Sequence, residues 1–132
     1  MYSKIKTMNK VNILGTDCLL EFGKYGNGTV SIAAINDGVP FLTLTVNWEE
    51  NWGGFFPYKK VCKFPVVVIK GYSENTGVPK NLIDVGVVTG GAYMENTNGS
   101  VEVMRLTPEW ISVAKKQIQK RYSLVNQIKN NH

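Results

Sequence analysis

Alternation of apolar and polar residues dominates the first two thirds of the chain. In "FLTLTVNW", residues 41–48, two sets of side chains alternate, with Phe41, Thr43 and Thr45 on one side and Leu42, Leu44 and Val46 on the other. This pattern is typical of an antiparallel strand that lays one face on a core. A second strand-like run, residues 29–35, precedes it and is separated from it by Asn36-Asp37-Gly38. These turn residues tolerate positive φ, so the pattern predicts a β-hairpin.

Further strands follow from the same reasoning. Residues 11–15 and 18–23 are short strand-like runs on either side of "TD", at 16 and 17. The run "PVVVI", residues 65–69, is apolar on both faces, which indicates a central position in a sheet. Residues 92–106 predict a hairpin that turns between Asn96 and Gly99.

In two places the spacing of the apolar residues changes from that of a strand to that of a helix. A short helix is predicted within residues 76–86, with Thr76 as N-cap, Pro79 at the third position and Gly86 at the end. A long helix is predicted from Thr107, with Pro108 at its first position. Its apolar arc comprises Trp110, Ile111, Ala114, Ile118, Tyr122, Val125 and Ile128.

These elements predict an α+β fold. We expect an antiparallel sheet of about five or six strands, one short helix, and a long C-terminal amphipathic helix packed on one sheet face. The chain of 132 residues fits a single domain, 1–132. Within it we distinguish a basic N-terminal segment (1–10), a sheet body with the short helix (11–106) and a basic C-terminal helix (107–132).

Charge is concentrated at the two ends of the chain. The net charge is +5, residues 1–10 contain three lysines and no acid, and residues 107–132 contain five basic groups and one acid. This distribution favours an acidic partner or a nucleic acid, although a solvated helix face kept charged for solubility remains the alternative.

Composition narrows the class of protein. No apolar run is long enough to cross a bilayer and the N-terminus lacks the pattern of a secretory signal, so we expect a cytoplasmic protein without a membrane partner. Cys18 and Cys62 are 44 positions apart, with no second cysteine or histidine near either. This spacing predicts free thiols, no metal site and no cofactor.

Catalysis is not expected. The single histidine, His132, ends the chain, which argues against a histidine-based triad. Lys70 and Ser73 are three positions apart and would face opposite sides of a strand. Glu49, Glu50 and Glu74 could pair as acid and base, but any domain with ten acids offers such pairs.

Two places are candidates for partner binding. Residues 47–60, "NWEENWGGFFPYKK", are too aromatic for an ordinary exposed loop. The rings could close a small core or bind a protein, and the acids beside them disfavour a nucleic-acid groove. The second place is the long helix, where Lys116 and Lys120 lie on the polar side and Arg121 lies inside the apolar arc. The candidate binding residues are Trp48, Glu49, Glu50, Trp52, Phe55, Phe56, Tyr58, Lys116, Lys120 and Arg121.

The segment "KGYSENTG", residues 70–77, packs many polar side chains into eight positions. We interpret it as a structural connection into the short helix, in which side chains are occupied with backbone N–H groups. The residues of this structural motif are Tyr72, Ser73, Glu74, Asn75 and Thr76.

The motif at residues 70–77 resembles part of the pattern of a small family from phages and conjugative elements of Gram-positive and related bacteria. The resemblance extends to "LTVN" at 44–47, "LIDVGVV" at 82–88 and "NGSVEVMRL" at 98–106. That family has the motif Lys-x-Tyr-Ser-Glu-Asn-x-Gly and carries no established activity, so no catalytic residues transfer. Pro79, the aromatic residues 48–58 and the basic helix depart from its pattern.

The resemblance implies a non-enzymatic binding protein from a mobile element. Such elements carry many small proteins that block host defence, so we expect a protein inhibitor of a bacterial defence complex, of the anti-CRISPR kind. Its partner would be a host or mobile-element protein, which could be a nucleoprotein effector. The alternative is a nucleic-acid-binding accessory protein of a mobile element, with a small hydrolase as a weaker third.

Overall fold

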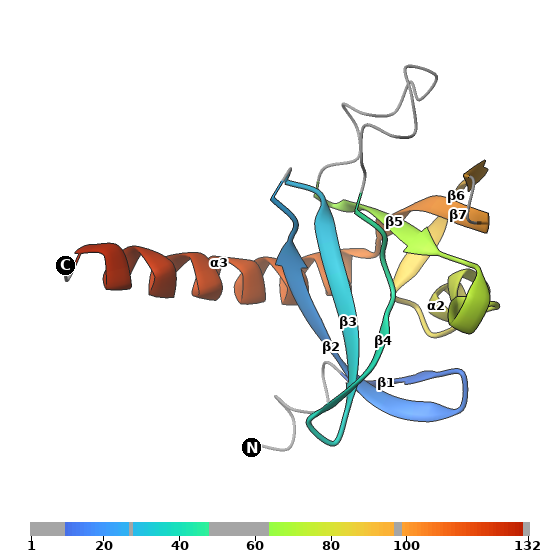
Figure 1. Cartoon of the computed structure of the whole chain (residues 1–132), viewed down its shortest axis with the longest axis horizontal. Helices are drawn as coiled ribbons and strands as arrows, with labels where there is room; N and C mark the ends of the chain where they lie inside the picture. Colours follow the sequence, from blue (N-terminus) through green and yellow to red (C-terminus); the bar gives the residue numbers. More distant parts are fainter. Residues whose placement is uncertain (1–9, 27, 48–63, 97–98, 131–132) are drawn as a thin grey trace.

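In the part of the chain that the structure describes, the strands form two antiparallel sheets, and helical segments accompany them (Figure 1). The computed structural model describes residues 10–26, 28–47, 64–96 and 99–130. For residues 92–96 and 125–130 it describes the backbone and not the side chains. The first sheet has the order β1-β2-β3-β4, and its strands are β1 (Lys10–Ile13), β2 (Thr16–Lys24), β3 (Val30–Asn36) and β4 (Val39–Thr43). The second has the order β5-β7-β6, and its strands are β5 (Val66–Lys70), β6 (Val88–Asn96) and β7 (Gly99–Leu106).

The helical segments are the 3₁₀ turn η2 (Ser73–Asn75), α2 (Val78–Asp84) and α3 (Pro108–Asn130). The α+β class is confirmed, with a short helix and a long C-terminal helix. The expectation of a single sheet was wrong in detail, because the strands divide into a four-stranded and a three-stranded sheet. No helix in the described ranges is long and apolar enough to cross a membrane.

Two tight turns set the register of the first sheet. Asp37 and Gly38 have φ of 48° and 78° and join β3 to β4, as the sequence predicts. The turn between β1 and β2 lies at Leu14 and Gly15, with φ of 50° and 90°, and not at residues 16 and 17. Leucine rarely adopts positive φ, so the apolar pattern concealed this turn.

The chain changes sheets directly after β4. The Leu44 N–H still donates to Ile32 O in β3 (2.9 Å), but the Leu44 carbonyl accepts from Lys70 N–H in β5 (2.9 Å). Val46 N–H then donates to Val68 O (3.1 Å). Residues 44–46 therefore form the second neighbour of β5, which places that strand between them and β7.

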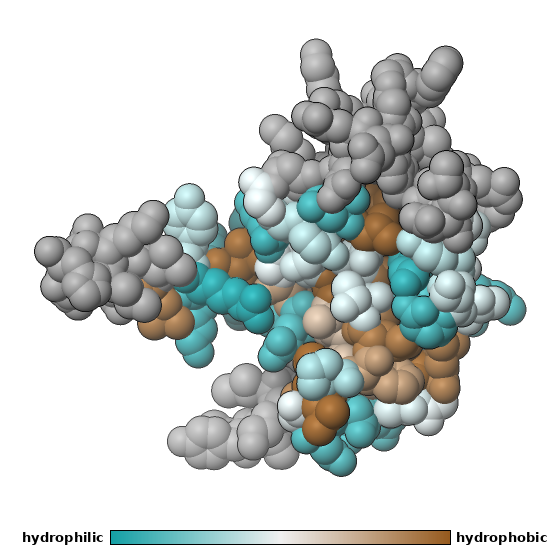
Figure 2. All heavy atoms as spheres, in the orientation of Figure 1, coloured by the Kyte–Doolittle hydropathy of each residue, from teal (hydrophilic) through white to brown (hydrophobic). Residues whose placement is uncertain are grey.

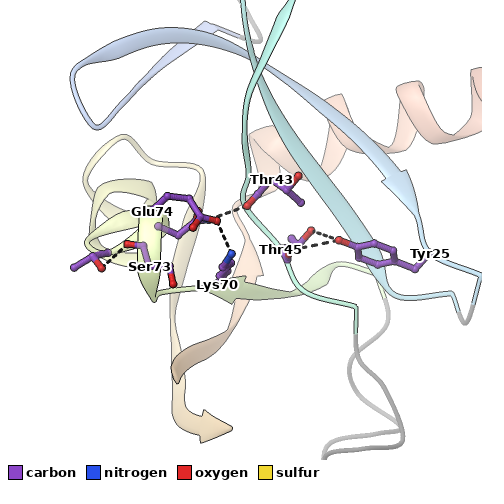
Figure 3. Close-up of polar contacts among 8 residues, drawn as sticks. Tyr25, Thr43, Thr45, Lys70, Ser73 and Glu74 are labelled. Carbon is purple, nitrogen blue, oxygen red and sulfur yellow. Dashed lines mark hydrogen bonds and ion pairs between the residues drawn. The ribbon is translucent and has the colours of Figure 1, made fainter. Parts of the chain in front are cut away.

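Thr45 stabilises this crossover with its side chain. In a regular antiparallel pair the Ile32 N–H would donate to the Leu44 carbonyl, but β5 occupies that acceptor. The Ile32 N–H donates instead to Thr45 Oγ1 at 3.0 Å, and the Tyr25 hydroxyl lies 3.1 Å from the same oxygen (Figure 3). Thr45 is consequently buried, although strict alternation placed it on the same side of the strand as Phe41 and Thr43, which are exposed.

One main core joins the two sheets. Its members come from β1, β2, β3, β5, α2, β6, β7 and α3 and from the segments between them. The largest fully buried side chains include Phe22, Ile13, Leu20, Ile32, Leu44 and Ile69. A smaller cluster of Val68, Val101 and Val103 lies elsewhere in the second sheet. Val67 and Ile69 belong to the main core and Val68 to the smaller one, which explains why β5 is apolar on both faces.

The short helix begins one residue later than predicted. Its N-cap is Gly77, with φ of 88° and no side-chain cap, and Pro79 lies at the second helical position. Its end follows the prediction: Gly86 has φ of 79° and donates its N–H to Ile83 O, while Val87 N–H donates to Leu82 O. This pair of bonds is the Schellman arrangement.

Candidate functional site

The first three turns of α3 are held against the body of the protein. Trp110, Val113 and Ala114 are buried, and the Trp110 ring lies 5.9 Å from the Phe22 ring, centroid to centroid, at 38°. At the start of the helix, the Thr107 hydroxyl donates to Gly86 O (2.8 Å) at the end of α2. The predicted packing of the apolar arc is therefore correct for this part of α3.

Gln117 ties α3 to the backbone of β2. Phe22 N–H donates to Gln117 Oε1 (2.8 Å), and Gln117 Nε2 donates to Leu20 O (3.1 Å). One side-chain amide thus pairs with a donor and an acceptor of the strand, as a neighbouring strand would do. Sequence reasoning missed this residue, because its partners are 95 and 97 positions away.

Arg121 marks the point where α3 leaves the body. Its Nη2 lies 3.7 Å from Glu21 Oε2, with both side chains more than half exposed. Its Nη1 lies close to the backbone of Gly23, 3.1 Å from the position a Cβ would take there. Arg121, which the sequence places inside the apolar arc, therefore pairs with an acid on the sheet. An exposed pair of this kind contributes about 0–1 kcal/mol to stability.

Beyond Arg121, α3 projects into solvent (Figure 1). Tyr122 is 70% exposed and Leu124 is 51% exposed, although the apolar arc predicted that Tyr122 would pack. The prediction required the sheet to extend along the whole length of the helix, but the contacts between α3 and β2 end at Arg121. Val125 and Ile128, which also belong to the predicted arc, are among the residues whose side chains the structure does not describe.

Exposed lysines accompany these apolar residues. Lys116 and Lys120 are exposed, as the helical wheel predicts, and so is their neighbour Lys115. In the described part of the chain none of the three forms an ion pair with an acid. Figure 2 shows hydrophilic and apolar residues side by side where α3 leaves the body. We call residues 115–124 of α3 the projecting surface.

The aromatic candidates lie outside the described residues: Trp48, Glu49, Glu50, Trp52, Phe55, Phe56 and Tyr58. The residue before this segment, Asn47, accepts a hydrogen bond at Oδ1 from Thr29 Oγ1 (3.3 Å).

The Lys70–Gly77 segment connects β5 to α2, and several of its side chains form hydrogen bonds or ion pairs (Figure 3). Lys70 Nζ donates to Glu74 Oε1 (2.5 Å) and lies 4.8 Å from the centre of the Tyr72 ring. The hydrogen bond from Lys70 holds the pKa of Glu74 below its ordinary value. A carboxylate paired with a lysine in this way is a poor general base.

Asn75 is the buried member of this segment. Its side chain has 0% exposure, and its Nδ2 donates to Thr43 O (2.8 Å). Its Oδ1 has no partner within the described part of the protein. The Thr76 hydroxyl donates to Ser73 O (2.8 Å). The side chains of Asn75 and Thr76 therefore donate to backbone carbonyls, which corrects the expectation that they accept from N–H groups.

Potential metal ligands do not cluster in the described ranges. No group of three histidine, cysteine, aspartate or glutamate side chains there could hold a metal ion. Cys18 is a buried free thiol, and burial together with the charge of Asp17 raises its pKa. Cys62 lies outside the described residues.

A shallow groove of about 290 Å³ lies between α2 and the β1–β2 turn. Its polar lining residues are Asn12, Lys80, Asn81 and Asp84. Asn81 accepts from Leu14 N–H (2.8 Å) and donates to Asn12 O (2.9 Å). Both ends of this amide serve to dock the turn on α2, so the groove presents no free polar group from Asn81.

Comparison of the chain with protein-family models, with curated proteins and with solved structures finds no match. The candidate site therefore depends on the geometry of α3 alone.

Proposed function

We propose that this is a non-enzymatic binding protein that contacts an acidic surface of a protein partner through the projecting surface of α3. The observation that carries the proposal is the combination of Tyr122 and Leu124, both more than half exposed, with lysines that have no acidic partner in the described residues. Burial of the apolar groups would supply affinity, and the lysines would speed association and select an acidic surface.

The resemblance to proteins of phages and conjugative elements directs the proposal further. In that setting a small binding protein without a catalytic site acts by occupying a host protein, so we propose inhibition of a bacterial defence complex in the cytoplasm. A CRISPR effector is one such complex. Trp48, Trp52 and the other aromatic candidates would add to the contact if they are exposed.

A nucleic-acid-binding accessory protein is the second candidate. Three exposed lysines within six positions, Lys115, Lys116 and Lys120, could follow a phosphate backbone. Phosphate contacts alone give binding that weakens steeply as salt rises, and they make no use of Leu124.

Phage infection of bacterial strains that each carry one defence system tests the proposal. The wild-type protein should raise plating of a phage that the system restricts, and Lys116→Glu with Lys120→Glu should abolish the effect. Lys24→Glu with Lys80→Glu is the matched control, because it makes the same change in charge at exposed positions of the body. The control should retain inhibition.

Two results would count against this function. Equal loss in both double variants would mean that net charge, and not the projecting surface, matters. Sub-micromolar binding of the purified protein to a DNA duplex at about 0.15 M salt, lost in the first variant only, would favour the nucleic-acid alternative.

A further inference from the structure

The two exposed apolar residues of α3 lie far apart around the helix. Successive residues turn by about 100°, so Tyr122 and Leu124 point about 160° apart. The arc between them continues the side of the helix that faces the body, because it contains Arg121, which reaches Glu21 on β2. A flat protein surface touches roughly a third of a helix circumference and would leave one of the two residues in water.

Lysines border this arc on both sides. Lys120 precedes Leu124 by four positions and therefore lies beside it, with Lys116 one turn further back. On the other side Lys115 precedes Tyr122 by seven positions, which is two turns along the same row. All three lysines are exposed.

From this arrangement we infer that α3 binds as a helix in a groove of its partner, with an apolar floor that receives Tyr122 and Leu124 and acidic rims that face the lysines. The inference rests on the proposed function and specifies its binding mode. A groove surrounds more of the helix than a flat surface does, and grooves of this kind accept amphipathic helices in other recognition systems. Residues 122–130 give about 14 Å of helix beyond Arg121, which is enough for about two and a half turns of contact.

Other occupants fit less well. A second copy would bring together two helices that each carry five basic groups and one acid over residues 107–132. An anionic membrane would have to take up Arg121, which lies in the middle of the arc, at the depth of the acyl chains. A protein groove can place a carboxylate there.

Calcium-loaded calmodulin is a suitable probe, because its Met-rich groove accepts basic amphipathic helices. The full chain is titrated against it by calorimetry at about 0.15 M and about 0.5 M salt. We expect binding that weakens about tenfold or more in Leu124→Ser and in Tyr122→Ser. Val39→Ser is the control: Val39 is an exposed apolar residue in the β3–β4 hairpin, and its loss should leave affinity unchanged.

Absence of binding, or equal affinity of all three variants, would overturn the inference. So would tighter binding of the wild type to phosphatidylserine vesicles or to a DNA duplex than to calmodulin at the higher salt. The infection experiment separates this from the proposed function. Inhibition that needs Lys116 and Lys120 but not Leu124 or Tyr122 would keep the function and reject the groove. Groove binding without inhibition of any defence system would do the reverse.

Discussion

The backbone N–H of Ile32 donates its hydrogen bond to the side-chain hydroxyl of Thr45, at 3.0 Å, because the carbonyl of Leu44 is already paired with β5. Thr45→Val keeps the shape of the side chain and leaves a buried N–H without a partner. We expect it to lower the free energy of unfolding by about 1–3 kcal/mol in chemical denaturation. Thr43→Val, the same change at an exposed position, should have little effect, and Thr45→Ser should retain most of the stability. Equal stability of Thr45→Val and wild type would contradict the crossover.

Asn75 gives a second stability prediction. Its buried amide donates to Thr43 O, so Asn75→Ala removes a buried hydrogen bond and should cost about 1–3 kcal/mol. Asn36 also donates to a backbone carbonyl, that of Asp17 (2.8 Å), but on the surface, where water can replace it. Asn36→Ala should therefore cost less than about 0.5 kcal/mol. Similar losses in both variants would mean that Asn75 is accessible to water.

Gln117→Leu tests the attachment of α3 to β2. It removes one acceptor and one donor from partly buried backbone groups, with an expected loss of about 1–2 kcal/mol. The more specific measurement is amide hydrogen exchange, which should become faster at Phe22. Gln119→Leu, on the exposed side of the same helix, should leave that amide protected. Unchanged exchange at Phe22 in Gln117→Leu would reject the contact.

Two neighbouring glycines in β6 should differ strongly in how far alanine in their place lowers stability. A Cβ on Gly91 would overlap the backbone carbonyl of Val103 in β7, so Gly91→Ala must push the β6–β7 hairpin apart. A Cβ on Gly90 would meet no atom within 4 Å. Thermal melting should therefore fall strongly for Gly91→Ala and little for Gly90→Ala. The reverse order would mean a different register of β6 on β7.

The Lys70–Glu74 pair predicts a pH dependence. Because the folded-state pKa of Glu74 is lowered, the stabilisation from this pair is present above the ordinary pKa of a glutamate and is lost as the pH falls through the folded-state pKa. The effect on unfolding is small, since Glu74 is exposed. An NMR titration should show the Glu74 carboxyl moving up toward its ordinary pKa in Lys70→Met and staying in place in Lys80→Met. A Glu74 that titrates normally in the wild type would show that the pair does not form in solution.

Local patterns predicted much of the fold. Asp37-Gly38 supplied the β3–β4 turn, Pro108 the start of α3, and the apolar run at 65–69 a strand buried on both faces. These features depend on backbone preference or on burial of a short segment, and both are properties of neighbouring residues.

The candidate site was only partly predictable. The helical wheel placed Lys116 and Lys120 in solvent, because side-chain direction along a helix is a local property. It placed Tyr122 on the packed side, because a wheel contains no information on where the sheet ends. It placed Arg121 inside the apolar arc without a partner, and only the tertiary structure supplied Glu21 of β2 as that partner.

By itself, then, the sequence determined the strands, the main turn of the first sheet, the amphipathic C-terminal helix and its basic charge. The tertiary structure decided that the strands form two sheets joined through Thr45 and that α3 extends beyond its contacts with β2. It also decided that the side chains of Asn75 and Gln117 hydrogen-bond to the backbone of distant segments. The reason is distance along the chain. Asn75 bonds a carbonyl 32 positions away and Gln117 an N–H 95 positions away, and no local propensity specifies partners at such separations.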